Sequence, residues 1–195
     1  MGAISGDDGG GGWVGLQAVR AAVRGHDGRG PHTVLEREVP AFFGVRTLLA
    51  VLEAIQTGAE DDYVVPLAPL VFRCAAEGDE VAQSIIDQQA DEVVAMIGSA
   101  ARRLHLLRRD ADVVLGGGLI HAGDGSFLRR VEAGVVGVIP AARMRPLRVL
   151  PVVGAALLGL DRLATSAEGP GVAPGAGDRL RRTLTRERLV TTQEA

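Results

Sequence analysis

Two glycine-rich segments of this sequence carry the residue types and spacing that suit ligand binding. The first, GDDGGGG at residues 6–12, leads into helical spacing that begins at Trp13. Successive backbone N–H groups in such a loop, with the positive end of the following helix, form a donor surface for a ligand. The carboxylates of Asp7 and Asp8 can take different roles, one toward ligand hydroxyls or hydrated Mg²⁺ and one outward. A flexible N-terminal tail without a ligand is the alternative that the sequence leaves open.

The second segment is a short apolar run, Val113 to Leu115, that ends in three glycines at 116–118. A β-branched run bounded by glycines is typical of a buried strand that ends in a turn. Such a turn lets a flat ligand, an adenine or a ribose, approach the main chain closely. The alternative is a tight strand-to-helix turn without a ligand. The segment is not the G-x-G-x-x-G dinucleotide fingerprint, because His121 stands where the last glycine would fall.

The residue types that are missing exclude several kinds of chemistry. All 21 basic residues are arginines, and the sequence contains neither lysine nor asparagine. Without lysine there is no P-loop NTPase and no Schiff-base enzyme, and without asparagine there is no N-glycosylation. The single cysteine, Cys74, excludes an internal disulfide framework and is interpreted as a buried small hydrophobe. The four histidines show no metal-ligand spacing, so we expect no metal site.

The distribution of charged and apolar residues limits the kinds of partner that we expect this protein to bind. Residues 1–100 hold 6 arginines and 15 acidic residues, whereas residues 101–195 hold 15 arginines and 9 acidic residues. The basic half is interpreted as a solvated helix face and a basic tail, with an anionic ligand as the alternative. Aromatic residues make up only 3% of the chain, which argues against nucleic-acid binding by base stacking. The longest apolar runs are about half of the ~20 residues that a membrane span needs, so we expect no membrane partner and a cytoplasmic protein.

The elements that must position the two segments are mostly helices. Thr33, with Glu36 three residues later, predicts a capping box, and Asp79 is a candidate cap for the longest helix. Two strands, at 112–116 and 146–151, alternate with helices, which is the signature of a βαβ unit with parallel strands. After Thr165 the composition changes to a linker at 168–177 and a basic helix at 178–190. The spacing of apolar residues predicts helices over 13–24, 33–43, 45–57, 63–77, 79–107, 126–138 and 153–164.

The order of these motifs resembles a known family. The segments GDDGGGGWVGLQAVRAAVRGHDGRGP, GDEVA, DVVLGGGLI and PVVGAALLGLD, which together cover about residues 5–163, are similar to the C-terminal half of the N-acetylglucosamine kinase-like group. This group overlaps the BadF/BadG/BcrA/BcrD ATPase family, within the actin/hexokinase/Hsp70-type superfamily. The resemblance implies a domain over residues 1–164 that is the C-terminal lobe of an actin-like ATPase or sugar kinase, followed by a largely disordered linker and basic tail over 165–195.

The resemblance also implies roles for individual residues. Asp7 matches the family's leading aspartate, which contacts the sugar hydroxyls, and Asp8 matches its glutamate. Gly10 and Gly11 match the small residues of the same sugar-binding loop. Kinases of this kind use Mg-ATP without a Walker lysine, because phosphoryl transfer depends mainly on positioning and charge stabilisation. The superfamily's adenosine-binding glycine turn matches Gly116, Gly117 and Gly118.

Departures from the family pattern limit what we expect of this chain. The sequence has no Asp-Gly-Gly-x-Thr phosphate loop, no catalytic aspartate in its family context and no second phosphate loop, so we name no catalytic residue and expect no activity from the chain alone. The expected fold is α/β but predominantly helical: a partial actin-like (ribonuclease H-like) C-terminal lobe with only about two parallel strands left and an exposed apolar face. A family branch that uses an iron–sulfur cluster is disfavoured, since a cluster needs several thiolates and only Cys74 is present.

Three functions stay open at this point. In the first interpretation, the chain derives from an ATP-dependent kinase of N-acetylglucosamine or a related hexosamine. It is then either a truncated form of that kinase or a part that a missing N-terminal lobe or a second copy in a homodimer completes. Alternatively, it is a non-catalytic nucleotide-binding or regulatory module that pairs with another chain. The third interpretation is an unrelated helical interaction protein whose glycine segments are only turns.

Overall fold

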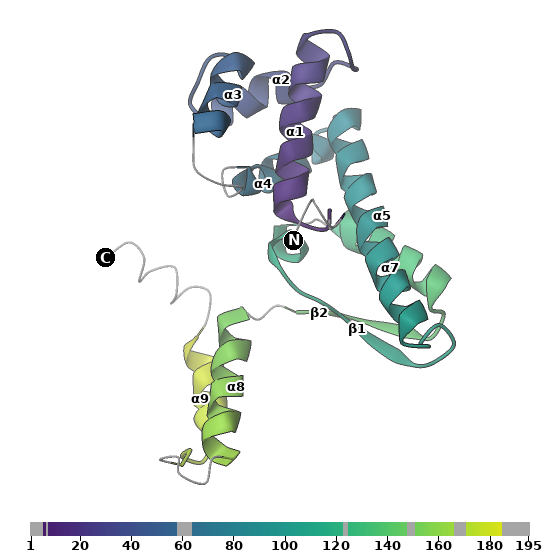
Figure 1. The fold of residues 1–195 in the computed structure, drawn as a ribbon, viewed down its shortest axis with the longest axis vertical. Helices are drawn as coiled ribbons and strands as arrows, with labels where there is room; N and C mark the ends of the chain where they lie inside the picture. Colours follow the sequence, from purple (N-terminus) through teal and green to yellow (C-terminus); the bar gives the residue numbers. More distant parts are fainter. Residues whose placement is uncertain are drawn as a thin grey trace. The chain divides into compact units, whose positions relative to one another are not determined.

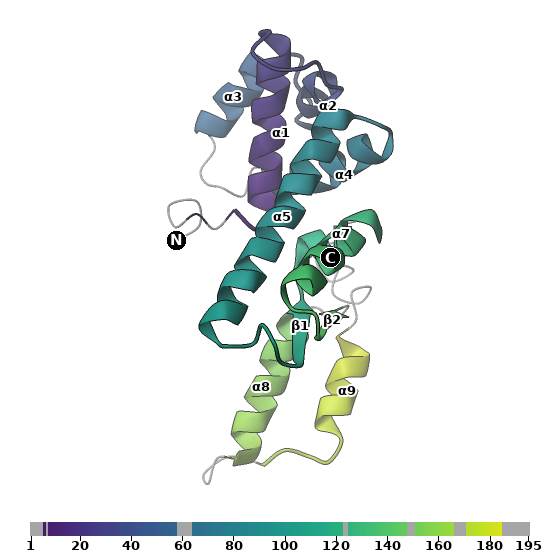
Figure 2. The ribbon, with the colours of Figure 1, turned by 90° about the vertical axis from the view of Figure 1, so that its right-hand side faces the viewer.

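The computed structural model describes residues 6, 8–57, 64–122, 125–147, 151–165 and 171–184. Contacts between residues divide the chain into two compact units, Met1–Arg145 and Pro146–Ala195. The fold is mainly helical with a two-stranded parallel sheet, which confirms the predicted fold class. Up to the second strand (Figures 1 and 2) the elements are α1 (Gly11–His26), α2 (Leu35–Phe42), α3 (Leu48–Thr57), the 3₁₀ turn η3 (Val65–Leu67), α4 (Ala68–Ala76), α5 (Glu80–Arg103), β1 (Ala111–Leu115), α6 (Gly118–Ala122), α7 (Gly125–Val138) and β2 (Ala142–Pro146).

Asp79 joins the N-termini of α5 and α2. Its carboxylate caps α5 by accepting the backbone N–H of Ala82 at 2.7 Å, as the sequence predicts. The same carboxylate accepts the backbone N–H of Val34 at 2.7 Å and the hydroxyl of Thr33 at 2.9 Å. The Glu36 side chain accepts the backbone N–H of Thr33 at 3.1 Å, which is half of the predicted capping box. One carboxylate therefore fixes two helix starts that lie 45 residues apart in the sequence.

Helix α5 ends earlier than its apolar spacing predicts. The stripe continues to Leu107, but the helix stops at Arg103. His105 takes a left-handed backbone conformation with φ of 58°, which cannot continue the helix. The N–H of Leu106 then bonds the carbonyl of Ala101 at 2.8 Å, so the end is closed in the manner of a Schellman motif. The prediction was wrong by four residues because periodicity does not report backbone handedness.

The core of the first unit is built from the inner faces of α1, α4, α5 and α7, with α5 in contact with the other three helices. Figures 1 and 2 show α5 running beside α1 and then beside α7. Val14 of α1, Val71 and Cys74 of α4 are fully buried. Phe72 and Phe127 meet edge to face, with ring centroids 5.6 Å apart, and join α4 to α7. The core is otherwise aliphatic, as the low aromatic content predicts.

Gln89 of α5 is the polar exception in this core. Its side chain is fully buried, and neither its amide nitrogen nor its amide oxygen has a hydrogen-bond partner in the structure. An unmade hydrogen bond at a buried polar group costs about 1–3 kcal/mol. Gln89 is therefore a local weakness in the packing of α5.

The strand–helix–strand unit is present, but the second strand lies elsewhere than predicted. Strand β2 covers Ala142–Pro146, whereas the sequence predicted 146–151 from its apolar residues. Residues 148–150 lie outside the described residues, and Pro151 begins the next helix. The true strand was missed because arginines occupy its outward positions, Arg143 and Arg145, while Ala142 and Met144 face inward.

The outward face of the sheet is charged. Arg143 donates to Asp112 at 2.8 Å and to Asp110 at 3.1 Å, and Arg145 lies 3.5 Å from Asp112. The hydrogen bond from Arg143 holds the pKa of Asp112 below its ordinary value. Val114, two residues after Asp112 on β1, is 56% exposed. The exposed side chains of the two strands are therefore mostly charged, with Val114 as an exposed apolar residue.

The second unit contains two helices, α8 (Pro151–Thr165) and α9 (Ala176–Thr183), which contact each other. Helix α8 confirms the predicted helix over 153–164. The predicted basic helix over 178–190 begins at Ala176, and residues 185–195 lie outside the described residues. No helix in the described part of the chain is both long and apolar enough to span a membrane.

Candidate functional site

The first glycine segment ends at the N-terminus of α1. Asp7 lies outside the described residues, and Asp8 is half-buried in the loop. Gly10 occupies the N-cap position in an extended conformation, and Gly11 is the first helical residue. Among the described residues no side chain caps this helix end, and the first turn of the helix holds no acidic residue. The first backbone N–H groups and the positive end of the helix dipole therefore remain available to a polar or anionic ligand.

Packing explains Gly15 and Gly25 of α1, where an added Cβ would come within 3.0 Å of a backbone oxygen, but not the glycines of the predicted site. A Cβ at Gly15 would overlap the carbonyl oxygen of Val64, just before η3, so α1 can approach η3 this closely only with glycine there. A Cβ at Gly11 would make ordinary contacts of 3.6–3.7 Å with Val65 and its neighbours, and a Cβ at Gly10 would meet nothing within 4 Å. The space beside Gly10 is thus open to a ligand.

The second glycine segment joins the carboxyl end of β1 to α6. Gly116 to Gly118 are exposed, between the buried side chains of Leu115 and Leu119. Gly117 has φ of +112°, in the region that favours glycine, and neither Gly117 nor Gly118 has an atom within 4 Å of an added Cβ. Ligands of parallel sheets bind beyond the carboxyl ends of the strands. The turn is therefore exposed, with open space beside its second and third glycines.

The two predicted loops are attached to the same helical layer. Helix α4 contacts α1, η3 and α6. The loop before α1 is thereby supported by η3, and the turn after β1 is supported through α6. His121, which breaks the dinucleotide fingerprint, belongs to α6.

Other reactive residue types have structural surroundings. Burial raises the pKa of the Cys74 thiol, so the thiolate is disfavoured. The backbone N–H of Thr33 and then the imidazole of His32 hold the pKa of Glu36 below its ordinary value. His32 itself is exposed and 3.0 Å from the Glu36 carboxylate. The described residues contain no cluster of three or more His, Cys, Asp or Glu side chains placed to hold a metal ion.

Two features were not predicted. The first is the link from Asp79 to Thr33, because neither residue's sequence context points to the other. The second is a cavity of about 630 Å³ between α1 and α5. The sequence hints at this cavity only through Arg20 and Arg24, which lie off the apolar face of α1. The opposite wall of the cavity comes from residues about 60 positions later, so the cavity itself could not be predicted.

Comparison with known proteins agrees with the order of motifs. The BadF/BadG/BcrA/BcrD ATPase family matches residues 1–159 of this chain. An N-acetylmuramic acid/N-acetylglucosamine kinase of Clostridium acetobutylicum is 26% identical over 121 residues, which are 62% of this chain and 40% of that kinase. The chain therefore matches less than half the length of this curated relative.

Proposed function

The chain belongs to the BadF/BadG/BcrA/BcrD ATPase family, and from this premise we propose that it carries the sugar-binding and adenosine-binding loops of an ATP-dependent kinase of N-acetylglucosamine or a related hexosamine. A nucleotide-binding function follows from the family; the sugar is suggested by the name of the Clostridium acetobutylicum relative. The observation that carries the proposal is the turn after β1, where Gly117 has φ of +112° and open space beside it.

On the sugar side, Asp7, Asp8, Gly10 and Gly11 are the proposed contacts. A carboxylate accepts hydrogen bonds from sugar hydroxyls, and the free N–H groups at the start of α1 donate to ligand oxygens. The half-buried position of Asp8 and the uncapped N-terminus of α1 support this arrangement. The proposed role of Asp7 rests on the sequence motif alone, because Asp7 lies outside the described residues.

On the nucleotide side, Gly116 to Gly118 would hold the adenosine. Bound Mg-ATP would supply the phosphoryl group for a sugar hydroxyl, while the residues of this chain bind and orient both ligands. Neither the phosphate loop nor the general base is recognisable in the sequence. We therefore propose that a separate N-terminal lobe or a second copy supplies them, that residues 1–164 form the lobe and 165–195 a linker and tail, and that the protein acts in the cytoplasm.

Isothermal titration with ADP and with N-acetylglucosamine tests the two sites separately. Gly117→Val forces a β-branched residue into a left-handed conformation and should weaken ADP binding at least tenfold. Asp8→Asn should weaken sugar binding and leave ADP binding unchanged. Gly137→Ala, on the exposed side of α7 with nothing within 4 Å, is the matched control. ADP binding that survives Gly117→Val unchanged, in a folded protein, would contradict the adenosine site.

The alternative is a non-catalytic nucleotide-binding or regulatory module that pairs with another chain. The sequence supports this alternative because it holds the glycine turn that matches the superfamily's adenosine motif but no recognisable phosphate loop. A chain that binds ADP tightly but never supports sugar phosphorylation, even with an N-terminal lobe supplied in trans, would establish the module and exclude the kinase.

A further inference from the structure

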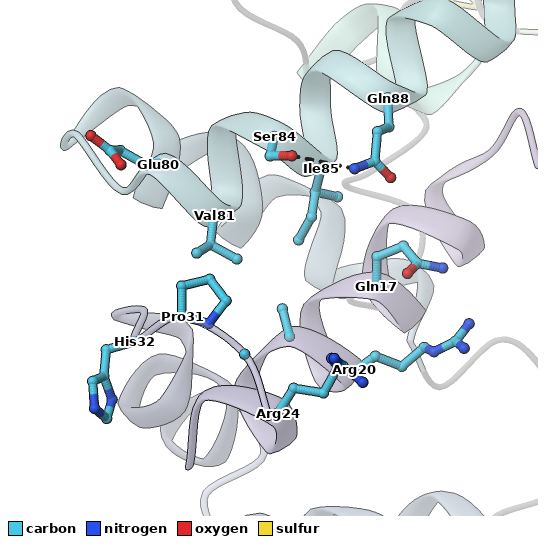
Figure 3. A pocket seen from close by; sticks show the side chains of 12 residues that line it. Gln17, Arg20, Arg24, Pro31, His32, Glu80, Val81, Ser84, Ile85 and Gln88 are labelled. Atoms are coloured by element: carbon cyan, nitrogen blue, oxygen red, sulfur yellow. Dashed lines mark hydrogen bonds between the residues drawn. The ribbon is translucent and has the colours of Figure 1, made fainter. Parts of the chain in front are cut away.

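None of the residues that line the cavity between α1 and α5 belongs to either glycine loop. Arg20 and Arg24 follow Gly10 on α1 by ten and fourteen residues, about 15 and 21 Å along the helix axis. Figure 3 shows side chains of α1 along one side of the cavity and side chains of α5 along the other. Its volume of about 630 Å³ falls within the range of small-molecule sites.

The floor of the cavity is apolar. Ala21 of α1, Pro31 of the following loop, and Val81 and Ile85 of α5 line it. In Figure 3, Val81 and Ile85 point between the helices toward Pro31. Gly30 brings the loop against α1, since a Cβ at Gly30 would lie 3.1 Å from the Cβ of Arg24.

The rim is polar and carries two positive charges on the α1 side. Arg20 and Arg24 are one helical turn apart, and neither forms an ion pair with a carboxylate of the described residues. Arg24 donates one hydrogen bond to the carbonyl of Arg29 at 2.7 Å, which leaves its other donors free. Like charges at this spacing repel each other, and an anion between them would remove the repulsion. Guanidinium groups bind phosphate and carboxylate with paired hydrogen bonds.

The α5 side of the rim offers groups for hydroxyls rather than for a second anion. Ser84 and Gln88 face the cavity and are joined by a hydrogen bond of 3.3 Å. Glu80 lies on the same side and can only accept hydrogen bonds when ionised. A ligand anion would be repelled by Glu80 and drawn toward Arg20, so the two walls impose an orientation.

We propose that this cavity binds a small organic anion: a hydroxylated molecule with one phosphate or carboxylate group on the α1 side, hydroxyls toward α5 and an apolar face on the floor. The site is separate from the proposed sugar and adenosine loops and does not depend on the proposed function. Arg20 is its principal anion contact, and Ser84 and Gln88 recognise the hydroxyls.

Isothermal titration of the full chain with glucose 6-phosphate, gluconate and glucose tests the site and separates the two anions. One of the two anionic probes should bind, and glucose should bind at least tenfold more weakly. Arg20→Ala should weaken that binding about tenfold or more, because a charge-assisted hydrogen bond is lost. Arg46→Ala, an exposed arginine without an ion pair in the described part of the chain, is the control and should leave binding unchanged.

Two further variants locate the ligand. Ser84→Phe, at an exposed position of α5, fills the cavity and should abolish binding, with circular dichroism confirming that the helices remain. Asp8→Asn and Gly117→Val alter the other two loops and should leave anion binding intact. The proposal is overturned if neither anion binds, if Arg20→Ala has no more effect than Arg46→Ala, or if binding is lost only on changing Asp8 or Gly117.

Discussion

Removing the Asp79 carboxylate tests how far one side chain holds the first unit together. Asp79→Ala deletes the N-cap of α5, worth about 0.5–2 kcal/mol. It also removes the acceptor of the Val34 N–H and the Thr33 hydroxyl, and each bond to a charged group contributes up to about 1.5–3 kcal/mol. Because Asp79 is only half-buried, we take slightly less than the sum of the lower ends and expect a loss of about 3 kcal/mol in the free energy of unfolding.

Urea unfolding followed by circular dichroism measures this loss. With a slope of about 2 kcal/mol/M, the midpoint should fall by about 1.5 M urea with the slope unchanged. Asp79→Asn keeps one acceptor oxygen and the capacity to cap, so it should lose about half as much. Glu132→Ala removes an exposed carboxylate of α7 that has no hydrogen bond or ion pair among the described residues, and should change the free energy by less than about 0.5 kcal/mol.

A double-mutant cycle with Thr33→Val checks the reason for the loss. If Asp79 acts through α2 as well as α5, the two substitutions should show a coupling energy of at least about 0.5 kcal/mol. A stability of Asp79→Ala within 0.5 kcal/mol of the unaltered chain, or independence of the two substitutions, would refute the linkage between the helix starts.

Three other substitutions test the packing and the electrostatics. Gly15→Ala should lower the free energy of unfolding by more than about 2 kcal/mol because its Cβ meets the carbonyl that precedes η3, whereas Gly12→Ala, with its nearest contact at 3.6 Å, should be neutral or stabilising in the same urea assay. Gln89→Leu should raise the melting temperature by removing an unpartnered buried amide, and Gln88→Leu, at an exposed position, should not; a lower melting temperature for Gln89→Leu would show that its amide is satisfied. Because the pKa of Glu36 is lowered in the folded protein, its contribution to the free energy of unfolding is complete above its ordinary pKa of 4.5 and is lost as the pH falls through the folded pKa. Glu36→Gln should therefore make the free energy of unfolding fall less steeply between pH 5 and pH 3. An unchanged dependence of stability on pH would contradict this role of Glu36.

Local patterns were sufficient to predict most of the helices. The apolar stripe of α1 and the run of small apolar residues in α8 each gave a helix within two residues of its observed bounds. Capping chemistry was also local, so Asp79 was identified as the start of α5. The end of α5 was misplaced because a left-handed His105 has no reliable signature, unlike a glycine at that position.

Long-range pairing accounts for what the sequence could not provide. Strand β2 carries Arg143 and Arg145, and a strand with two arginines is recognisable only when their partners, Asp112 on β1 and Asp110 just before it, are known to lie beside it. The glycine loops were found because glycine is informative wherever a φ such as that of Gly117 is required. The cavity beside Arg20 was not found, because its second wall depends on how α5 packs against α1.

Because the chain's only cysteine is buried, the rate at which its thiol is labelled measures how often the surrounding helices open. A maleimide cannot reach the Cys74 sulfur while α4 is packed, so the labelling rate equals the rate of the free thiol multiplied by the fraction of time that α4 is open. No reporter has to be introduced, and no denaturant is needed. If opening exposes α4 together with the start of α5, the 3 kcal/mol expected for Asp79→Ala corresponds to labelling about 150-fold faster. If α4 opens alone, the rate stays the same, and labelling kinetics then divide the first unit into parts that unfold separately.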